Sequence, residues 1–255
     1  MFPLLKIRNL THYFAGLKAV SNFNLTLYSK EIVGLIGPNG AGKTTVFNLI
    51  SGLHKPSFGE IYFKGEPIHG KRPYHITEKG IARTFQNIRL FSDMSVIENI
   101  KVAYHYKRKY GIFSAFMVDK QFQRHESEIE DMANNLLDMF NLREFAEKKA
   151  GSLPYGQQRR LEIIRALATE PEILLLDEPA AGMNPIEADQ LLHTIHDLRD
   201  RFNLTIFLIE HQMRVVMGVC ERIKVMDFGE TIAEGTPEQI QKDKKVIEAY
   251  LGEEG

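Results

Sequence analysis

The sequence has one cysteine, Cys220, so the chain can form no internal disulfide, and a reducing compartment suits it. We expect this thiol to be a small buried apolar group rather than a catalytic one. No stretch approaches the roughly 18 uninterrupted apolar residues of a membrane-spanning helix, and residues 1–6 lack the pattern that opens a secretory signal. If the protein works at a membrane, another polypeptide must supply the spanning helices.

An excess of charge of one sign is also absent. The formal net charge is −1, so no overall positive field attracts nucleic acid or anionic lipid. A basic and aromatic segment at 104–110 is short and isolated, which favours a solvated loop or a surface facing a membrane or a partner. We therefore expect no nucleic-acid partner.

Apolar residues make up 44% of the 255 positions, enough for a sizeable core in about one or two domains. Apolar runs at Ile32–Ile36, 173–176 and Thr205–Ile209 predict strands that are buried on both faces. The helix-like stretch Pro185–Phe202 separates the last two runs, and this order predicts a parallel sheet. Other patterns predict short strands at 6–10, 23–28 and 60–64, a helix at Lys43–Ile50 ending near Gly52, and a capped helix start at 236–239.

The middle of the chain, from about 87 to 161, has a different pattern. Six apolar residues recur there at helical spacing, so one face of a helix is apolar. This region predicts a helical subdomain inserted into an α/β core. The six residues are Ile129, Met132, Ala133, Leu136, Leu137 and Phe140.

Residues 37–44 match G-x-x-x-x-G-K-[ST] between a predicted strand and a predicted helix. Glycines let backbone N–H groups surround phosphate oxygens, and the helix N-terminus favours the anion. Lys43 is expected to neutralise the β- and γ-phosphates of ATP, and the Thr44 hydroxyl to ligate Mg²⁺. The expected nucleotide-binding residues of this loop are Gly37, Asn39, Gly40, Ala41, Gly42, Lys43, Thr44 and Thr45.

The apolar run at 173–176 is followed by two adjacent carboxylates, Asp177 and Glu178. Solvated carboxylates often end strands, so this pattern alone is weak. Together with the phosphate loop, it predicts that Asp177 holds Mg²⁺ through water and that Glu178 orients and polarises the attacking water.

With these motifs, the chain resembles an ATP-binding-cassette (ABC) ATPase from end to end. The resemblance implies an α/β fold of the P-loop NTPase class, formed as a single nucleotide-binding domain. About residues 1–86 and 162–255 would form a RecA-like parallel-sheet core with an antiparallel β subdomain, and 87–161 the helical subdomain. It also implies that Gln86 contacts Mg²⁺ and senses the transmembrane partner, and that His211 reaches the γ-phosphate and helps hold Glu178 and the water.

The signature loop of the family, usually Leu-Ser-Gly-Gly-Gln, is similar to Leu153, Pro154, Tyr155, Gly156 and Gln157. Proline has neither hydroxyl nor N–H, so one expected donor to the γ-phosphate is missing. In this family the signature loop completes the site of the opposite subunit. The departure therefore bears on the site of a partner rather than on this chain's own phosphate loop.

Two further segments are interpreted through the resemblance. Residues 180–184 resemble the loop that joins the two subunits of the dimer, with Asn184 where many members carry aspartate. The adenine is expected to stack on an aromatic ring near the N-terminus. Phe14 matches that position best, with Tyr13 as the alternative.

Longer matches narrow the resemblance to the larger ATPases of branched-chain amino acid uptake systems (LivG type). They lie at 84–91, 154–163, 177–185 and 236–252. This implies a motor at the cytoplasmic face of the membrane, paired with a second ATPase subunit of the same or another kind. Permease subunits and an external solute-binding protein would complete the system. Three alternatives stay open: a motor for another solute or a lipid, a soluble non-transport ATPase, and a nucleotide-sensing subunit with little catalysis.

Overall fold

The computed structural model describes residues 2–107 and 120–251, which form two compact units. One unit comprises residues 2–86 and 172–251, and the other the described residues between 87 and 171. The sequence predicted junctions at about 86–87 and 161–162, and the two compact units divide at 86–87 and 171–172. None of the helices in these described ranges has the length and apolarity that crossing a membrane requires.

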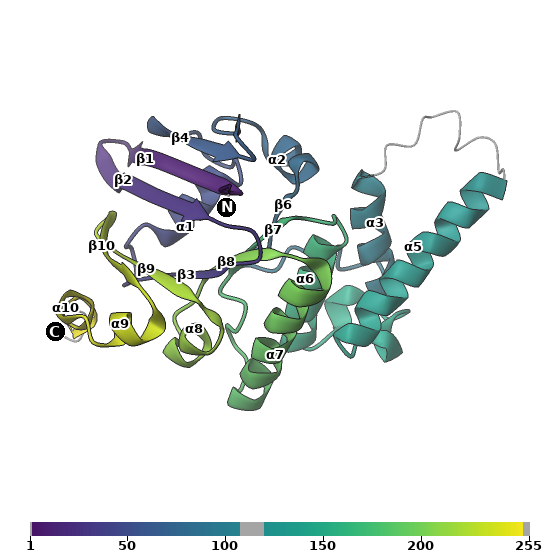
Figure 1. The fold of residues 1–255 in the computed structure, drawn as a ribbon. Helices are drawn as coiled ribbons and strands as arrows, with labels where there is room; N and C mark the ends of the chain where they lie inside the picture. Colours follow the sequence, from purple (N-terminus) through teal and green to yellow (C-terminus); the bar gives the residue numbers. More distant parts are fainter. Residues whose placement is uncertain (1, 108–119, 252–255) are drawn as a thin grey trace. The chain divides into compact units, whose positions relative to one another are not determined.

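A six-stranded sheet forms the centre of the first unit, in the order β10-β9-β3-β8-β7-β6 (Figure 1). Its five neighbouring strands from β9 to β6 are parallel, as predicted, and only β10 pairs antiparallel. All residues of β3, β7 and β8 are buried, which explains their continuous apolar sequences. The strands are β3 (Ile32–Ile36), β6 (Ile81–Arg83), β7 (Ile173–Asp177), β8 (Thr205–Ile209), β9 (Arg222–Asp227) and β10 (Glu230–Gly235).

A four-stranded antiparallel sheet, in the order β2-β1-β4-β5, belongs to the same unit. Its apolar residues alternate with exposed ones, as expected of a sheet with one solvated face. The predicted strands at 6–10, 23–28 and 60–64 all fall in it. Its strands are β1 (Leu5–Phe14), β2 (Leu17–Leu27), β4 (Phe58–Phe63) and β5 (Glu66–Pro67).

Two helices of this unit, α7 and α9, begin where the sequence carries capping signals. Asn184 accepts hydrogen bonds from the N–H groups of residues 186 and 187 and caps α7, and Thr236 opens α9 with a capping box. The helices are α1 (Lys43–Ile50), α2 (Pro73–Lys79), α7 (Pro185–Phe202), α8 (Met213–Val219), α9 (Pro237–Gln241) and α10 (Lys244–Leu251).

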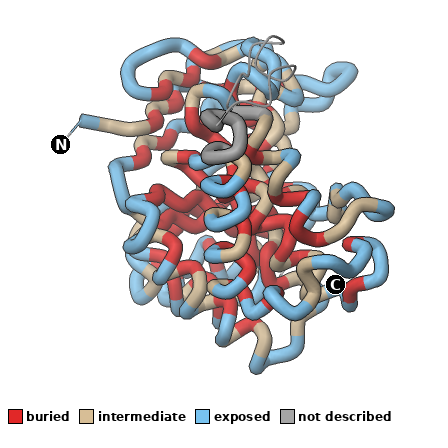
Figure 2. The backbone as a smooth tube through the Cα atoms, turned by 90° about the vertical axis from the view of Figure 1, so that its right-hand side faces the viewer, coloured by how far each residue is buried: buried red, intermediate tan, exposed pale blue. Residues whose placement is uncertain are grey.

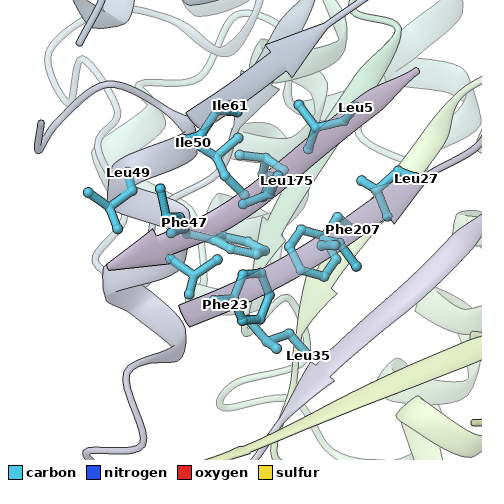
Figure 3. Packing of buried hydrophobic residues seen from close by; sticks show 14 of the residues in the cluster. Leu5, Phe23, Leu27, Leu35, Phe47, Leu49, Ile50, Ile61, Leu175 and Phe207 are labelled. Atoms are coloured by element: carbon cyan, nitrogen blue, oxygen red, sulfur yellow. The ribbon is translucent and has the colours of Figure 1, made fainter. Parts of the chain in front are cut away.

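One apolar cluster joins α1 to strands of both sheets (Figure 3). The ring of Phe47 on α1 lies 5.1 Å, centroid to centroid, from the ring of Phe207 on β8. Figure 2 shows buried residues mainly along the inner parts of the traced chain and exposed residues mainly at its outer bends. The core therefore fixes the helix that follows the phosphate loop against the sheet that carries the acidic pair.

The second unit is helical, with α3 (Val96–Lys107), α5 (Lys120–Met139), two 3-10 turns at Arg143–Phe145 and Ala150–Ser152, and α6 (Tyr155–Leu167). The predicted apolar face at 129–140 is buried, apart from the half-buried Met132. Of the basic segment 104–110, residues 104–107 belong to α3 and 108–110 lie outside the described residues. Tyr104 is buried, and its hydroxyl donates to Glu170 at 3.2 Å, so this part of the segment is not a solvated loop.

Candidate active site

The phosphate loop connects the buried strand β3 to α1 and depends on glycine at two positions. Gly37 has φ +147°, and a Cβ there would lie 2.0 Å from the Met226 carbonyl oxygen. Gly42 has φ +98°, and its Cβ would lie 2.4 Å from the Ala19 carbonyl oxygen. Backbone carbonyl groups of β2 and β9 therefore lie so close to the loop that only glycine fits at these two positions.

Lys43, the first residue of α1, is 5% exposed and turns back over the loop. Its ammonium donates to the carbonyl oxygens of Gly37 at 2.6 Å and Pro38 at 2.7 Å. The first turn of α1 contains no acidic residue and no side chain caps it. The N–H groups of this first turn, the dipole of α1 and the Lys43 ammonium together form a site that suits a polyphosphate. Asn39, Gly40 and Thr44 are exposed at this loop, and Thr45 is half-buried.

Asp177 ends β7 with 1% exposure, and its carboxylate forms an ion pair with Arg83 at 2.8 Å. Arg83 ends β6, and its guanidinium also donates to Asn48 at 2.7 Å and Ser51 at 3.0 Å. Both acceptors belong to α1 or its last turn. Arg83 therefore ties the helix of the phosphate loop to the acidic strand, a role that no sequence motif indicates.

Glu178 lies between the two residues predicted to act with it. Gln86 Nε2 donates to Glu178 Oε2 at 3.0 Å, and His211 Nε2 lies 3.0 Å from Glu178 Oε1. Glu178 has φ +49°, a region that costs a non-glycine residue energy, and its N–H donates to the Ile209 carbonyl at 2.9 Å. The structure thus brings together three side chains from distant parts of the sequence.

Both aromatic candidates for adenine stacking are partly exposed on β1. The Phe14 ring is 41% exposed and meets the rings of His12 and His54 edge-on at 4.6 and 5.3 Å. The Tyr13 ring is 39% exposed and meets Phe58 edge-on at 6.4 Å. Burial, and then the charge of His54, lower the pKa of His12. The exposures do not discriminate between the two rings.

The signature loop belongs to the helical unit and leads into α6. Pro154 is the N-cap residue and offers no side-chain cap, as its chemistry requires. Its carbonyl accepts the N–H groups of Gln157 and Gln158, both at 3.0 Å. Tyr155 is exposed, but its hydroxyl accepts a hydrogen bond at 3.0 Å from Arg159, which is 1% exposed. The tyrosine that replaces glycine is therefore anchored by a buried arginine. Leu153 is buried, and Gly156 and Gln157 are half-buried.

Two family models match this chain. One, described as "ABC transporter", matches residues 20–181, and another, described as "Branched-chain amino acid ATP-binding cassette transporter", matches residues 230–255. The chain is 51% identical to the high-affinity branched-chain amino acid transport ATP-binding protein LivG of Escherichia coli (strain K12), over 98% of each chain.

Solved structures agree with these matches. A crystal structure of the ADP conformation of MJ1267, an ATP-binding cassette of an ABC transporter, is 31% identical with a TM-score of 0.85, covering 99% of this chain and 100% of that one. A dimeric post-hydrolysis structure of the cassette MJ0796, bound to ADP and phosphate, is 28% identical with a TM-score of 0.78, covering 91% of this chain and 98% of that one.

Proposed function

We propose that this chain, which belongs to the ABC transporter family and is one of its ATPases, drives the import of branched-chain amino acids. The observation that carries the proposal is the 51% identity to LivG over 98% of both chains. The match of residues 230–255 to a branched-chain amino acid transporter model supports it independently. Leucine, isoleucine and valine are the proposed solutes, and other subunits bind them.

The phosphate loop is the proposed site for the ATP phosphates. The backbone of residues 37–42 and the first turn of α1 would surround the phosphates, and the Lys43 ammonium, which lies against the loop, would neutralise charge on the β- and γ-phosphates. Thr44 and Asp177, with Gln86, are the proposed ligands of Mg²⁺, because hydroxyl, carboxylate and amide oxygens are the donors that this ion prefers. When bound, the ion neutralises charge that develops on the phosphates.

The Glu178 carboxylate is the proposed group that orients the attacking water. The water attacks the γ-phosphorus, and the bond to the bridging oxygen of the departing ADP breaks. Gln86 and His211 hold the two carboxylate oxygens in place, and this geometry supports their assignment as catalytic partners. Catalysis on this proposal is mainly positioning and charge stabilisation.

A second ATPase subunit is the proposed source of the signature loop that completes this site. Residues 153–157 of this chain would in turn complete the ATP site of that second subunit. The solved dimer of a related cassette supports this arrangement. Permease subunits, with an external solute-binding protein, would couple hydrolysis to import. The proposed location is the cytoplasmic face of the membrane, peripheral and bound to those subunits.

Two variants test the catalytic assignments in the full-length chain. Glu178→Gln should bind ATP, retain it and nearly abolish phosphate release; normal release would remove Glu178 from the chemistry. Lys43→Ala should weaken ATP binding, whereas Lys64→Ala, which removes a half-exposed lysine paired with Glu172, should not. Equal ATP affinity in the two lysine variants would contradict the proposed site.

The transported solute requires a separate test. The chain should co-purify with membrane-spanning subunits, and the reconstituted complex should accumulate leucine, isoleucine and valine when supplied with ATP. Active hydrolysis without uptake of these amino acids would point to another solute or a lipid. Failure to associate with any membrane subunit would favour a non-transport ATPase.

A further inference from the structure

A second buried carboxylate lies next to the Glu178–His211 pair. Glu210 follows β8 directly and is 2% exposed. Its Oε1 accepts the N–H of Ala180 at 2.9 Å, and its Oε2 accepts the N–H groups of His211 at 2.8 Å and Gln212 at 3.1 Å. One side chain therefore joins the segment that leaves Glu178 to the segment that carries His211.

The two segments are also linked by hydrogen bonds that do not involve Glu210. The Gln212 side-chain amide donates to the Ala180 carbonyl at 3.1 Å, and the Glu178 N–H donates to the Ile209 carbonyl at 2.9 Å. A buried carboxylate is costly unless hydrogen bonds compensate its charge. The three N–H groups that donate to Glu210 are therefore held close to their present positions, and the backbone at residues 180, 211 and 212 is constrained with them.

We propose that Glu210 is a positioning residue of the ATPase reaction, which fixes the backbone of His211 against the backbone that follows Glu178. The inference rests on the proposed roles of those two residues. Residues 180–184 are also the loop expected to meet a second ATPase subunit. Glu210 thus links that subunit contact to the placement of His211.

The test is Glu210→Gln in the full-length chain, measured as steady-state phosphate release with Mg-ATP. Glutamine has the same shape, but its NH₂ group would face backbone N–H donors, so one segment must shift. Misplacement of a catalytic group typically costs on the order of tenfold to a hundredfold in rate. We expect kcat to fall in that range, with ATP affinity within about twofold of the unaltered chain.

Glu31→Gln is the matched control. Glu31 is also largely buried, with 17% of its side chain exposed, and its carboxylate accepts a backbone N–H and pairs with Arg222. It precedes β3, at the opposite end of that strand from the phosphate loop. This variant should keep the kcat of the unaltered chain.

A double variant separates positioning from general stability. Because Glu210 acts through His211, adding Glu210→Gln to His211→Ala should lower kcat by less than about twofold further. Unchanged kcat in Glu210→Gln alone would overturn the inference, and so would a full multiplicative loss in the double variant. Normal turnover in both Glu178→Gln and His211→Ala would instead overturn the proposed site, which distinguishes the two failures.

If Glu210→Gln does not fold, Glu210→Asp replaces it. Aspartate keeps the buried negative charge, but its side chain is one methylene shorter and cannot reach the Ala180 N–H and the His211 and Gln212 N–H groups together. We expect a loss of kcat that is again missing in the His211→Ala background. In that case, an unchanged kcat in Glu210→Asp would overturn the inference.

Discussion

Replacing Arg83 by methionine should destabilise the chain far more than removing a charge from an exposed ion pair. The Arg83–Asp177 pair is nearly excluded from solvent, with 6% and 1% of the two side chains exposed. Removing one partner of such a pair leaves an uncompensated buried charge, which costs roughly 3–5 kcal/mol. For a chain of this length, each kcal/mol lowers the melting temperature by about 2–4 °C, so we expect a fall of roughly 6–20 °C.

Thermal unfolding of the full-length chain without nucleotide measures this directly. The chain contains no tryptophan, so far-UV circular dichroism is the suitable signal. Lys64→Met is the control, because it breaks an ion pair whose side chains are 51% and 45% exposed. Exposed pairs contribute about 0–1 kcal/mol, so this variant should melt within about 4 °C of the unaltered chain.

A second substitution tests the reason for the expected fall. Adding Asp177→Asn to Arg83→Met removes the stranded charge, so the double variant should recover much of the lost melting temperature. If the Arg83 variant melts like the Lys64 variant, the pair is not a buried electrostatic contact. If the double variant is less stable than Arg83→Met, the loss does not come from an uncompensated Asp177.

Gly37→Ala should abolish ATP binding or folding, because its Cβ would lie 2.0 Å from a backbone carbonyl oxygen; Gly65→Ala, also at a positive φ but outside the phosphate loop and with no neighbouring atom within 4 Å, should retain ATP binding, as equilibrium titration would show. Burial strongly raises the pKa of the Cys220 thiol, so an aromatic disulfide reagent at pH 8 should react only after unfolding in urea. The pKa of His12 is lowered in the folded state, so its contribution to stability is present above about pH 6.5 and is lost at lower pH. The urea midpoint should therefore fall less between pH 7 and pH 5 in His12→Gln than in the unaltered chain.

Local patterns were sufficient to predict three strands of the central sheet and the helices α1 and α7. The strands β3, β7 and β8 are continuous apolar runs because both of their faces are covered. Strand β9 did not stand out, because Arg222 and Lys224 interrupt its apolar residues. In the structure these cations pair with Glu31 and Glu234, which allows a charged sequence to occupy the interior of the sheet.

The candidate site also combines contiguous motifs, which the sequence reveals, with contacts that only the fold creates. The phosphate loop and the acidic pair are contiguous motifs, so their chemistry is evident from the sequence. Arg83 and Asp177 are 94 positions apart, and only the pairing of β6 with β7 brings them together. Cys220 is buried, as the sequence predicted. The choice between Phe14 and Tyr13 stays a prediction, because both rings are similarly exposed.

The left-handed backbone conformation of Glu178 sets a trade-off between the thermal stability of the protein and its rate of ATP hydrolysis. A left-handed conformation costs a side chain of this kind roughly 1–2 kcal/mol, and glycine adopts it freely. Selection of this protein for heat resistance alone should therefore favour glycine at position 178. The more stable variant would lack the carboxylate proposed to orient water. A screen for stability alone would therefore select inactive protein unless ATP hydrolysis were selected with it.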